Sequence, residues 1–215
     1  MIKTKENISV WYEGLEDFSI DQIYEQYILV KEFFGIEEDL KIRIILCSKK
    51  EDLMFFTGLK ELNEFTLGRA IISLNLIAMY SPEAIEKNTI KNRHNFRGAI
   101  AHEMAHLFYN KKNYPQKLQL LNEGIASYIQ WSIVNKKDFN QDIKIENIDI
   151  LQEYSSDIYK KGLFLVELII KNLGKERLIG FLDTIKNYEE EKIKEEFNKI
   201  INIELKGGIK DNGKK

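Results

Sequence analysis

Two of the three histidines in this chain of 215 residues stand four positions apart, in the string His-Glu-Met-Ala-His at residues 102–106. On an α-helix, His102 and His106 differ by about 40° of rotation, so both imidazoles share a face and can bind one metal ion. Glu103 is turned by roughly 100° from His102 and can reach a metal-bound water from the side. The string therefore requires a helix through these residues and predicts a zinc hydrolase site; a chance occurrence on an ordinary helix is the alternative.

A catalytic zinc ion usually has three protein ligands and a water, so the string needs a third ligand. His94 lies eight residues before His102, about 12 Å along a helix, and we interpret it as an exposed residue at the helix start. Glu123 is the stronger candidate. The helix is expected to end near Lys111, roughly 8 Å along its axis beyond His106. Glu123 lies roughly 10 Å into the next helix, which runs back antiparallel, so it returns to the level of His106.

The residue after Glu123 indicates that this part of the helix has an unusual environment. Gly124 is expected in a helix interior, where glycine is less favourable than alanine by about 1 kcal/mol. Ala126 and Ser127 nearby are also small. A residue that is unfavourable for its local structure indicates that packing or function requires it at that position. A surface glutamate remains the alternative interpretation of Glu123.

Strand and helix patterns alternate in the first third of the chain, and from Pro82 onward only helices are expected. One helix is capped by Ser19 or Asp21 and ends at Gly35. The other early elements are a strand at 8–12, a strand at 42–46, a short helix at 49–56 and a half-exposed strand at 69–76. The later helices are expected at 95–111, 116–136, 156–173, 175–188 and 190–203, with Gly174 as a stop between two of them.

Composition excludes several classes of protein. The 32 basic and 34 acidic residues are well mixed and give a net charge of −2, so no nucleic-acid partner is expected. The longest uncharged stretch, residues 70–82, is 13 residues long and too short to span a membrane. The first residues contain no apolar signal segment, so we expect a cytoplasmic protein. The single cysteine, Cys47, lies in an apolar run and is interpreted as a packing residue.

The residues around the string resemble the gluzincin metallopeptidases, specifically the peptidase MA-like and aminopeptidase N-type catalytic domains. After the string come Asn-Glu-Gly-Ile-Ala-Ser-Tyr at 122–128 and Ile-Tyr-Lys-Lys-Gly at 158–162. The second of these is similar to the Tyr-x-Lys-Gly element of aminopeptidase N-type enzymes, and residues 163–188 match its helix–Gly–helix continuation. The resemblance is specific between about residues 99 and 188, and the earlier order of elements agrees more weakly.

The resemblance implies an α+β fold, a thermolysin-like gluzincin catalytic domain. A small mixed sheet with helices would form an upper lobe over about 1–113, and an all-helical lower lobe would cover about 114–205, with a zinc cleft between them. Residues 1–205 would be a single minimal domain, and 206–215 a flexible tail.

The resemblance implies that His102, His106 and Glu123 bind one Zn²⁺ per chain. It makes Glu103 the general base and Tyr159 the donor to the tetrahedral intermediate, with Tyr154 close enough to be an alternative. Gly162, three residues after Tyr159, would let that helix lie close to the metal helices.

The chain departs from the family in three places. It has no Gly-x-Met-Glu-Asn sequence, the element that anchors a substrate's free amino terminus in the aminopeptidases. Only 16 residues separate His106 from Glu123, fewer than in those enzymes. Ser127 stands where thermolysin-like enzymes place an acidic residue that orients a zinc ligand.

These observations predict a zinc peptidase that cleaves internal bonds. Residues 66–81 contain no acidic side chain to hold an amino terminus, and an extended substrate is expected to pair with the backbone of residues 71–75. A peptide or protein substrate is the expected partner, and the chain is expected to be a monomer. Two alternatives remain: a zinc-bound pseudo-peptidase with a peptide-binding or regulatory role, and a metal-free interaction domain.

Overall fold

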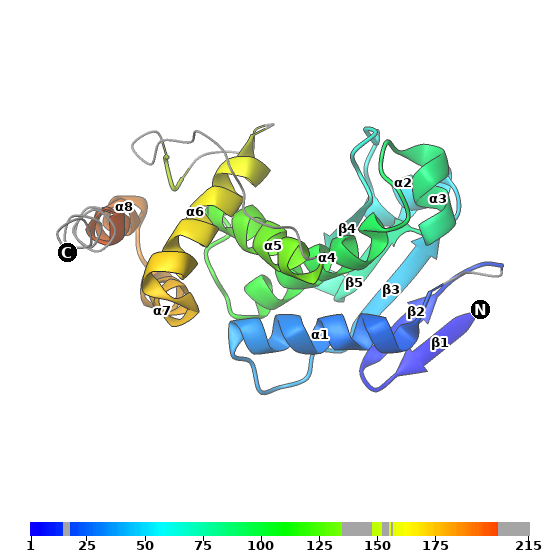
Figure 1. Cartoon of the computed structure of the whole chain (residues 1–215), viewed down its shortest axis with the longest axis horizontal. Coiled ribbons are helices and arrows are strands. Elements are labelled where there is room, and N and C mark those ends of the chain that lie inside the picture. The colour runs from blue at the N-terminus through cyan, green and yellow to red at the C-terminus, as the bar shows by residue number, and fades with distance from the viewer. Residues whose placement is uncertain (15–17, 135–147, 152–154, 156, 202–215) are drawn as a thin grey trace, which may run out of the picture. The chain divides into compact units, whose positions relative to one another are not determined.

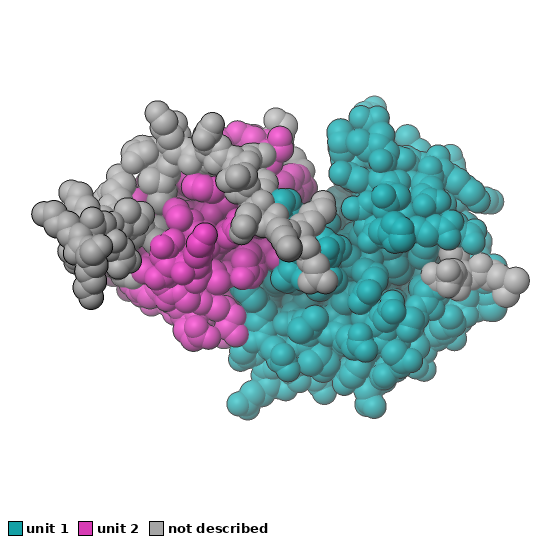
Figure 2. All heavy atoms as spheres, in the orientation of Figure 1, with its two compact units in different colours: residues 1–108, 129–136 teal, residues 109–128, 137–215 magenta. Residues whose placement is uncertain are grey.

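The computed structural model describes residues 1–14, 18–134, 148–151, 155 and 157–201. The chain divides into two compact units, Met1–Phe108 with Ile129–Lys136, and Tyr109–Tyr128 with Lys137–Lys215 (Figure 2). The boundaries fall within helices α4 (Asn95–Lys111) and α5 (Gln119–Ile133), so both helices contribute residues to both units.

The first unit contains a five-stranded mixed sheet with strand order β1-β2-β3-β5-β4 (Figure 1). Strands β2, β3 and β5 pair in parallel, and β1 and β4 pair antiparallel at the two edges. The strands are Ile2–Lys5, Ile8–Trp11, Ile42–Cys47, Gly68–Ile71 and Leu76–Tyr80 in order from β1 to β5. All five residues of β5 are buried, as expected for an apolar strand that is covered on both faces.

Helix α1 (Ile20–Phe34) has the local signals expected of it. The Ser19 side chain caps its start by accepting a hydrogen bond from the Gln22 amide at 3.3 Å, and Gly35 ends it in the left-handed region with φ of 60°. Its buried face includes Tyr27 and Phe34, whose ring centroids lie 5.4 and 6.3 Å from that of Phe108. The repeat of apolar residues three and four apart therefore faces the core.

Helices α2 (Lys50–Thr57) and α3 (Pro82–Asn88) complete the described elements of the first unit. The first confirms the short helix expected at 49–56. In α3, Ser81 caps the helix start and Pro82 occupies its first turn, where a missing backbone N–H leaves no hydrogen bond unmade.

One expectation about the sheet was wrong, and one strand was not predicted. The strand expected at 69–76 is instead a hairpin: β4 ends at Ile71, a short 3₁₀ turn covers Ile72–Leu74, and β5 begins at Leu76. Asn75 adopts a left-handed conformation with φ of 46°, which asparagine tolerates better than most residues. The strand that was not predicted is β1, in which no residue is buried.

The described residues of the second unit are helical apart from the connections. Besides its parts of α4 and α5, this unit contains α6, α7 and α8. Their bounds are Ile158–Leu173, Lys175–Ile185 and Glu190–Lys199. Gly174, with φ of 87°, separates α6 from α7 as predicted. Apolar side chains from all three helices are buried, and the rings of Phe181 and Phe197 lie 6.3 Å apart.

The later helices agree with the predicted ones to within a few residues at each end. The exceptions that cannot be compared are the ends predicted at 135–136, 156 and 202–203 and the tail at 206–215, which lie outside the described residues. No helix in the described part of the chain is long and apolar enough to cross a membrane. The chain is a mixed α/β protein, and the strands in its described residues all precede residue 81, in agreement with the α+β class.

Candidate metal centre

Helix α4 carries the His-Glu-x-x-His string and is buried around most of its circumference. His102 is 8% exposed, whereas Glu103 and His106 are half-buried. The apolar residues of α4 that flank these polar side chains are all buried: Ala99, Ile100, Ala101, Met104, Ala105, Leu107 and Phe108. The polar side chains therefore lie in apolar surroundings, where electrostatic interactions are stronger than in water.

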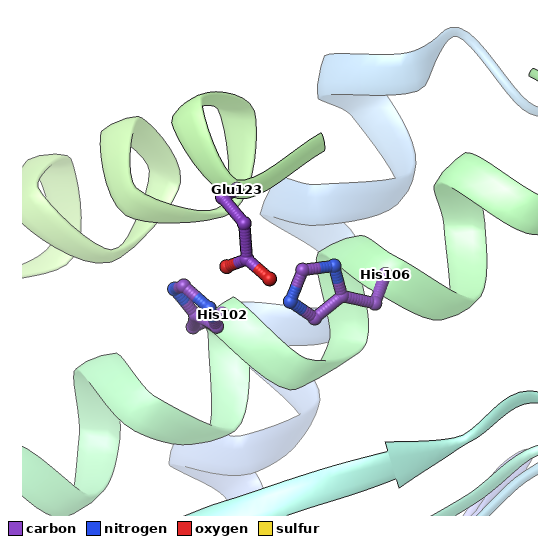
Figure 3. A group of neighbouring side chains, drawn as sticks. All are labelled: His102, His106 and Glu123. Atoms are coloured by element: carbon purple, nitrogen blue, oxygen red, sulfur yellow. The ribbon is translucent and has the colours of Figure 1, made fainter. Parts of the chain in front are cut away.

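The structure brings together the three residues predicted to bind metal. His102, His106 and Glu123 each offer one ligand atom, and these atoms lie within 4.8 Å of one another. The two imidazole rings are 4.9 Å apart with an angle of 80° between their planes. Figure 3 shows the Glu123 carboxylate pointing toward both rings. Two imidazoles and one carboxylate are a donor set typical of catalytic zinc, so these residues fit that metal.

The connection between the two helices has a defined geometry. After α4 ends at Lys111, Asn113 adopts a left-handed conformation with φ of 55°. The Tyr114 amide donates to the Tyr109 carbonyl at 3.3 Å, and the Tyr109 hydroxyl donates to the Pro115 carbonyl at 3.2 Å. This short connection sets where α5 begins, and thereby where Glu123 lies along it.

Close packing of two helices accounts for the glycine at position 124. A Cβ atom added to Gly124 would lie 2.4 Å from the carbonyl oxygen of Gly162, and one added to Gly162 would lie 2.4 Å from the carbonyl oxygen of Leu120. Real Cβ atoms essentially never approach backbone so closely. Helices α5 and α6 therefore meet backbone to backbone. This confirms the expectation that Gly162 permits close approach, and it identifies packing as a reason for Gly124.

Glu103 has a partner that sequence patterns did not reveal. Its Oε2 atom accepts a hydrogen bond of 2.7 Å from the backbone amide of Ala70 in β4. Every residue except proline carries such an amide, so no residue type marks this one as special. Only the placement of β4 beside α4 identifies it.

The remaining candidate residues are placed as follows. Tyr159 is the second residue of α6 and is 39% exposed, and Tyr154, the alternative, lies outside the described residues. His94 is exposed and precedes α4, as expected. Ser127 is buried, with 6% of its surface exposed.

Cys47 lies in β3 and is buried, as expected for a packing residue. Burial disfavours its thiolate, and the negative charges of Asp52 and Glu13 act in the same direction, so the pKa of the thiol rises to about 12. A thiol of this kind is not a nucleophile at neutral pH.

Comparison with known proteins adds no family assignment. No protein-family model matches the sequence, and no curated protein matches it.

Proposed function

We propose that this protein is a zinc-dependent peptidase with a thermolysin-like gluzincin fold. The single observation that carries the proposal is the convergence of His102, His106 and Glu123 beside Glu103. This set combines a zinc donor set with a carboxylate suited to proton transfer. The fold assignment is supported by the order of elements, in which a small mixed sheet precedes a series of helices.

Each residue has a proposed role in peptide hydrolysis. His102, His106 and Glu123 would hold the zinc ion, which when bound supplies a Lewis acid that polarises the substrate carbonyl and acidifies water. Glu103 accepts the proton of the attacking water and passes it to the leaving amine. Tyr159 donates its hydroxyl hydrogen to the oxyanion, with Tyr154 as the alternative donor.

Substrate pairing is proposed at the edge strand, over a shorter stretch than the sequence suggested. Residues 72–74 form a 3₁₀ turn, so extended pairing along 71–75 cannot occur as predicted. Strand β4, residues Gly68–Ile71, lies at the sheet edge. Its outward backbone groups, apart from the Ala70 amide that already donates to Glu103, can pair with an extended backbone. Because no acidic residue lies in 66–81, the proposed reaction is cleavage of internal bonds.

The test combines a metal assay with digestion of a broad peptide library. Glu103→Gln keeps the shape of the side chain and removes the base, so zinc should stay while hydrolysis falls by about 10²–10⁴-fold. Glu83→Gln, at an exposed position of α3, is the matched control and should change neither quantity. Wild-type protein that binds no zinc, even when zinc is added, would rule out the proposal.

One observation favours a second candidate function. Ser127 is buried at the position where the resemblance implies an acidic residue that orients a zinc ligand. Removing such a partner typically weakens metal affinity or activity by about 10–100-fold. A zinc-loaded protein that binds library peptides without cleaving any of them would support a pseudo-peptidase with a peptide-binding or regulatory role.

A further inference from the structure

The Ala70 amide points away from its own sheet. Among the strands that the structure describes, β4 pairs only with β5, and the Tyr80 amide donates to the Leu67 carbonyl at 2.8 Å. In an antiparallel pair, residues alternate between those bonded to the neighbour and those facing outward. With the observed register, Arg69 and Ile71 face β5, and the amide of Ala70 faces the free edge. That outward amide is the one that donates to Glu103.

We propose that the Ala70 backbone N–H is a positioning group for the Glu103 carboxylate, an inference that rests on the proposed function. A glutamate side chain has three rotatable bonds, and a hydrogen bond of 2.7 Å to one carboxylate oxygen restricts them. Bonds to an ionised acceptor are among the stronger ones in proteins. Because Oε2 accepts the hydrogen bond from Ala70, Oε1 is the oxygen that accepts the proton of the attacking water.

A backbone donor suits this role because pairing within the sheet sets its position. Unlike a side-chain donor, the Ala70 amide cannot change rotamer. The flanking residues Arg69 and Ile71 pair with β5 and so fix its position. Groups on rigid elements hold catalytic geometry more accurately than groups on loops. Through this bond, β4 and α4 together determine the orientation of the base, and Ala70 acts through Glu103 rather than on the substrate.

Amide hydrogen exchange tests the contact independently of activity. In wild-type protein the Ala70 amide should be protected, and Glu103→Ala should remove that protection. The amides of Arg69 and Ile71 are internal controls, since their bonds lie within the sheet and should stay protected. Equal exchange of the Ala70 amide in the wild-type and Glu103→Ala proteins would overturn the inference.

Kinetics of zinc-loaded Ala70→Pro protein test the positioning role. Proline removes this N–H and is tolerated at an outward-facing edge position. We expect kcat to fall by about tenfold to a hundredfold, with zinc content unchanged and KM altered less than about twofold. Ala70→Gly keeps the N–H and should retain kcat. In a Glu103→Gln background, Ala70→Pro should cause little further loss, because the two changes affect one function.

The outcomes separate this inference from the proposed function. Undiminished kcat in Ala70→Pro, or an equal loss in the Glu103→Gln background, overturns the positioning role and leaves the peptidase function intact. Wild-type protein that hydrolyses no peptide overturns both. If Ala70→Pro does not fold, replacing the Ala70 amide by an ester removes the same hydrogen, and the same kinetic outcomes decide.

Discussion

Gly124 of α5 and Gly162 of α6 are in backbone contact, so close that neither position can accept a methyl group without a shift of the helices. Glu123 immediately precedes one of these glycines, and Tyr159 lies three residues before the other. The helix crossing therefore constrains the elements that carry a proposed zinc ligand and the proposed oxyanion donor.

This contact predicts an unusual cost for adding a methyl group in a helix. Gly124→Ala and Gly162→Ala should each lower the free energy of unfolding by about 1–3 kcal/mol, because overpacking outweighs the better helix propensity of alanine. Gly180→Ala in α7 is the matched control, since a Cβ there meets nothing within 4 Å. It should be neutral or stabilising by up to about 1 kcal/mol. Urea unfolding measures all three; equal effects at the three sites would contradict the prediction.

Metal content should follow the three predicted ligands. Elemental analysis of protein purified without chelator should find close to one zinc per chain, and His102→Ala, His106→Ala and Glu123→Ala should each lose it. Zinc should also raise the melting temperature of the wild-type protein, since a ligand that binds only the folded state stabilises it. His94→Ala is the control and should retain the metal. Retention of zinc by His106→Ala would show that the ligand set is wrong.

The two candidate tyrosines can be separated by removing one hydroxyl at a time. Tyr159→Phe should keep zinc and reduce kcat by about 10²–10³-fold, the usual effect of losing one oxyanion donor. Tyr154→Phe should have little effect. The reverse pattern in steady-state kinetics would assign the role to Tyr154.

Blocking the amino terminus of a substrate tests which bonds are cut. We expect a cleavable peptide and its N-acetylated form to be hydrolysed at similar rates, within about threefold, because no charged anchor for an α-ammonium is expected and such anchors use charge-assisted bonds. Mass spectrometry of both digests gives the sites and rates. Complete loss of cleavage after acetylation would indicate an aminopeptidase.

Cys47 should be unreactive in the folded protein. A thiol pKa of about 12 in place of 9.0 corresponds to a thiolate fraction smaller by about a thousandfold at pH 8. Because the nucleophilicity of a thiolate rises with its pKa, reaction with a disulfide reagent should be slower by at least about tenfold. Addition of urea should restore the ordinary rate. The raised pKa also means that the folded state disfavours the thiolate, so this residue's contribution to stability is lost as pH rises from about 9 through 12. Rapid labelling without denaturant would contradict the burial of this side chain.

Features of this protein that depend on local chemistry could be predicted from the sequence. Ser19 and Gly35 mark the ends of α1 because capping and left-handed termination are properties of single residues. The helix through His102 and His106 followed from spacing alone. Gly124 could be recognised as unusual because glycine is unfavourable in a helix interior, and its partner Gly162 was expected to allow close packing.

Other features depend on tertiary pairing and could not be predicted. The alternation of Ile72, Leu74 and Leu76 resembled a single strand, whereas Asn75 reverses the chain and pairs β5 with β4. Alternation records which side chains are apolar and does not record where the backbone turns. The bond between Ala70 and Glu103 was invisible for a similar reason, because a backbone donor leaves no mark on residue type.

The bond between Glu103 and the edge of the sheet has a consequence for self-association. Exposed strand edges with unpaired amides are templates on which another chain can add a strand and aggregate. In this protein β4 is only four residues long, and one of its outward amides, that of Ala70, is already occupied by Glu103. Substituting Glu103 by alanine would therefore add an unpaired amide to this edge as well as remove a carboxylate, whereas glutamine, which keeps an acceptor oxygen, would keep the Ala70 amide bonded.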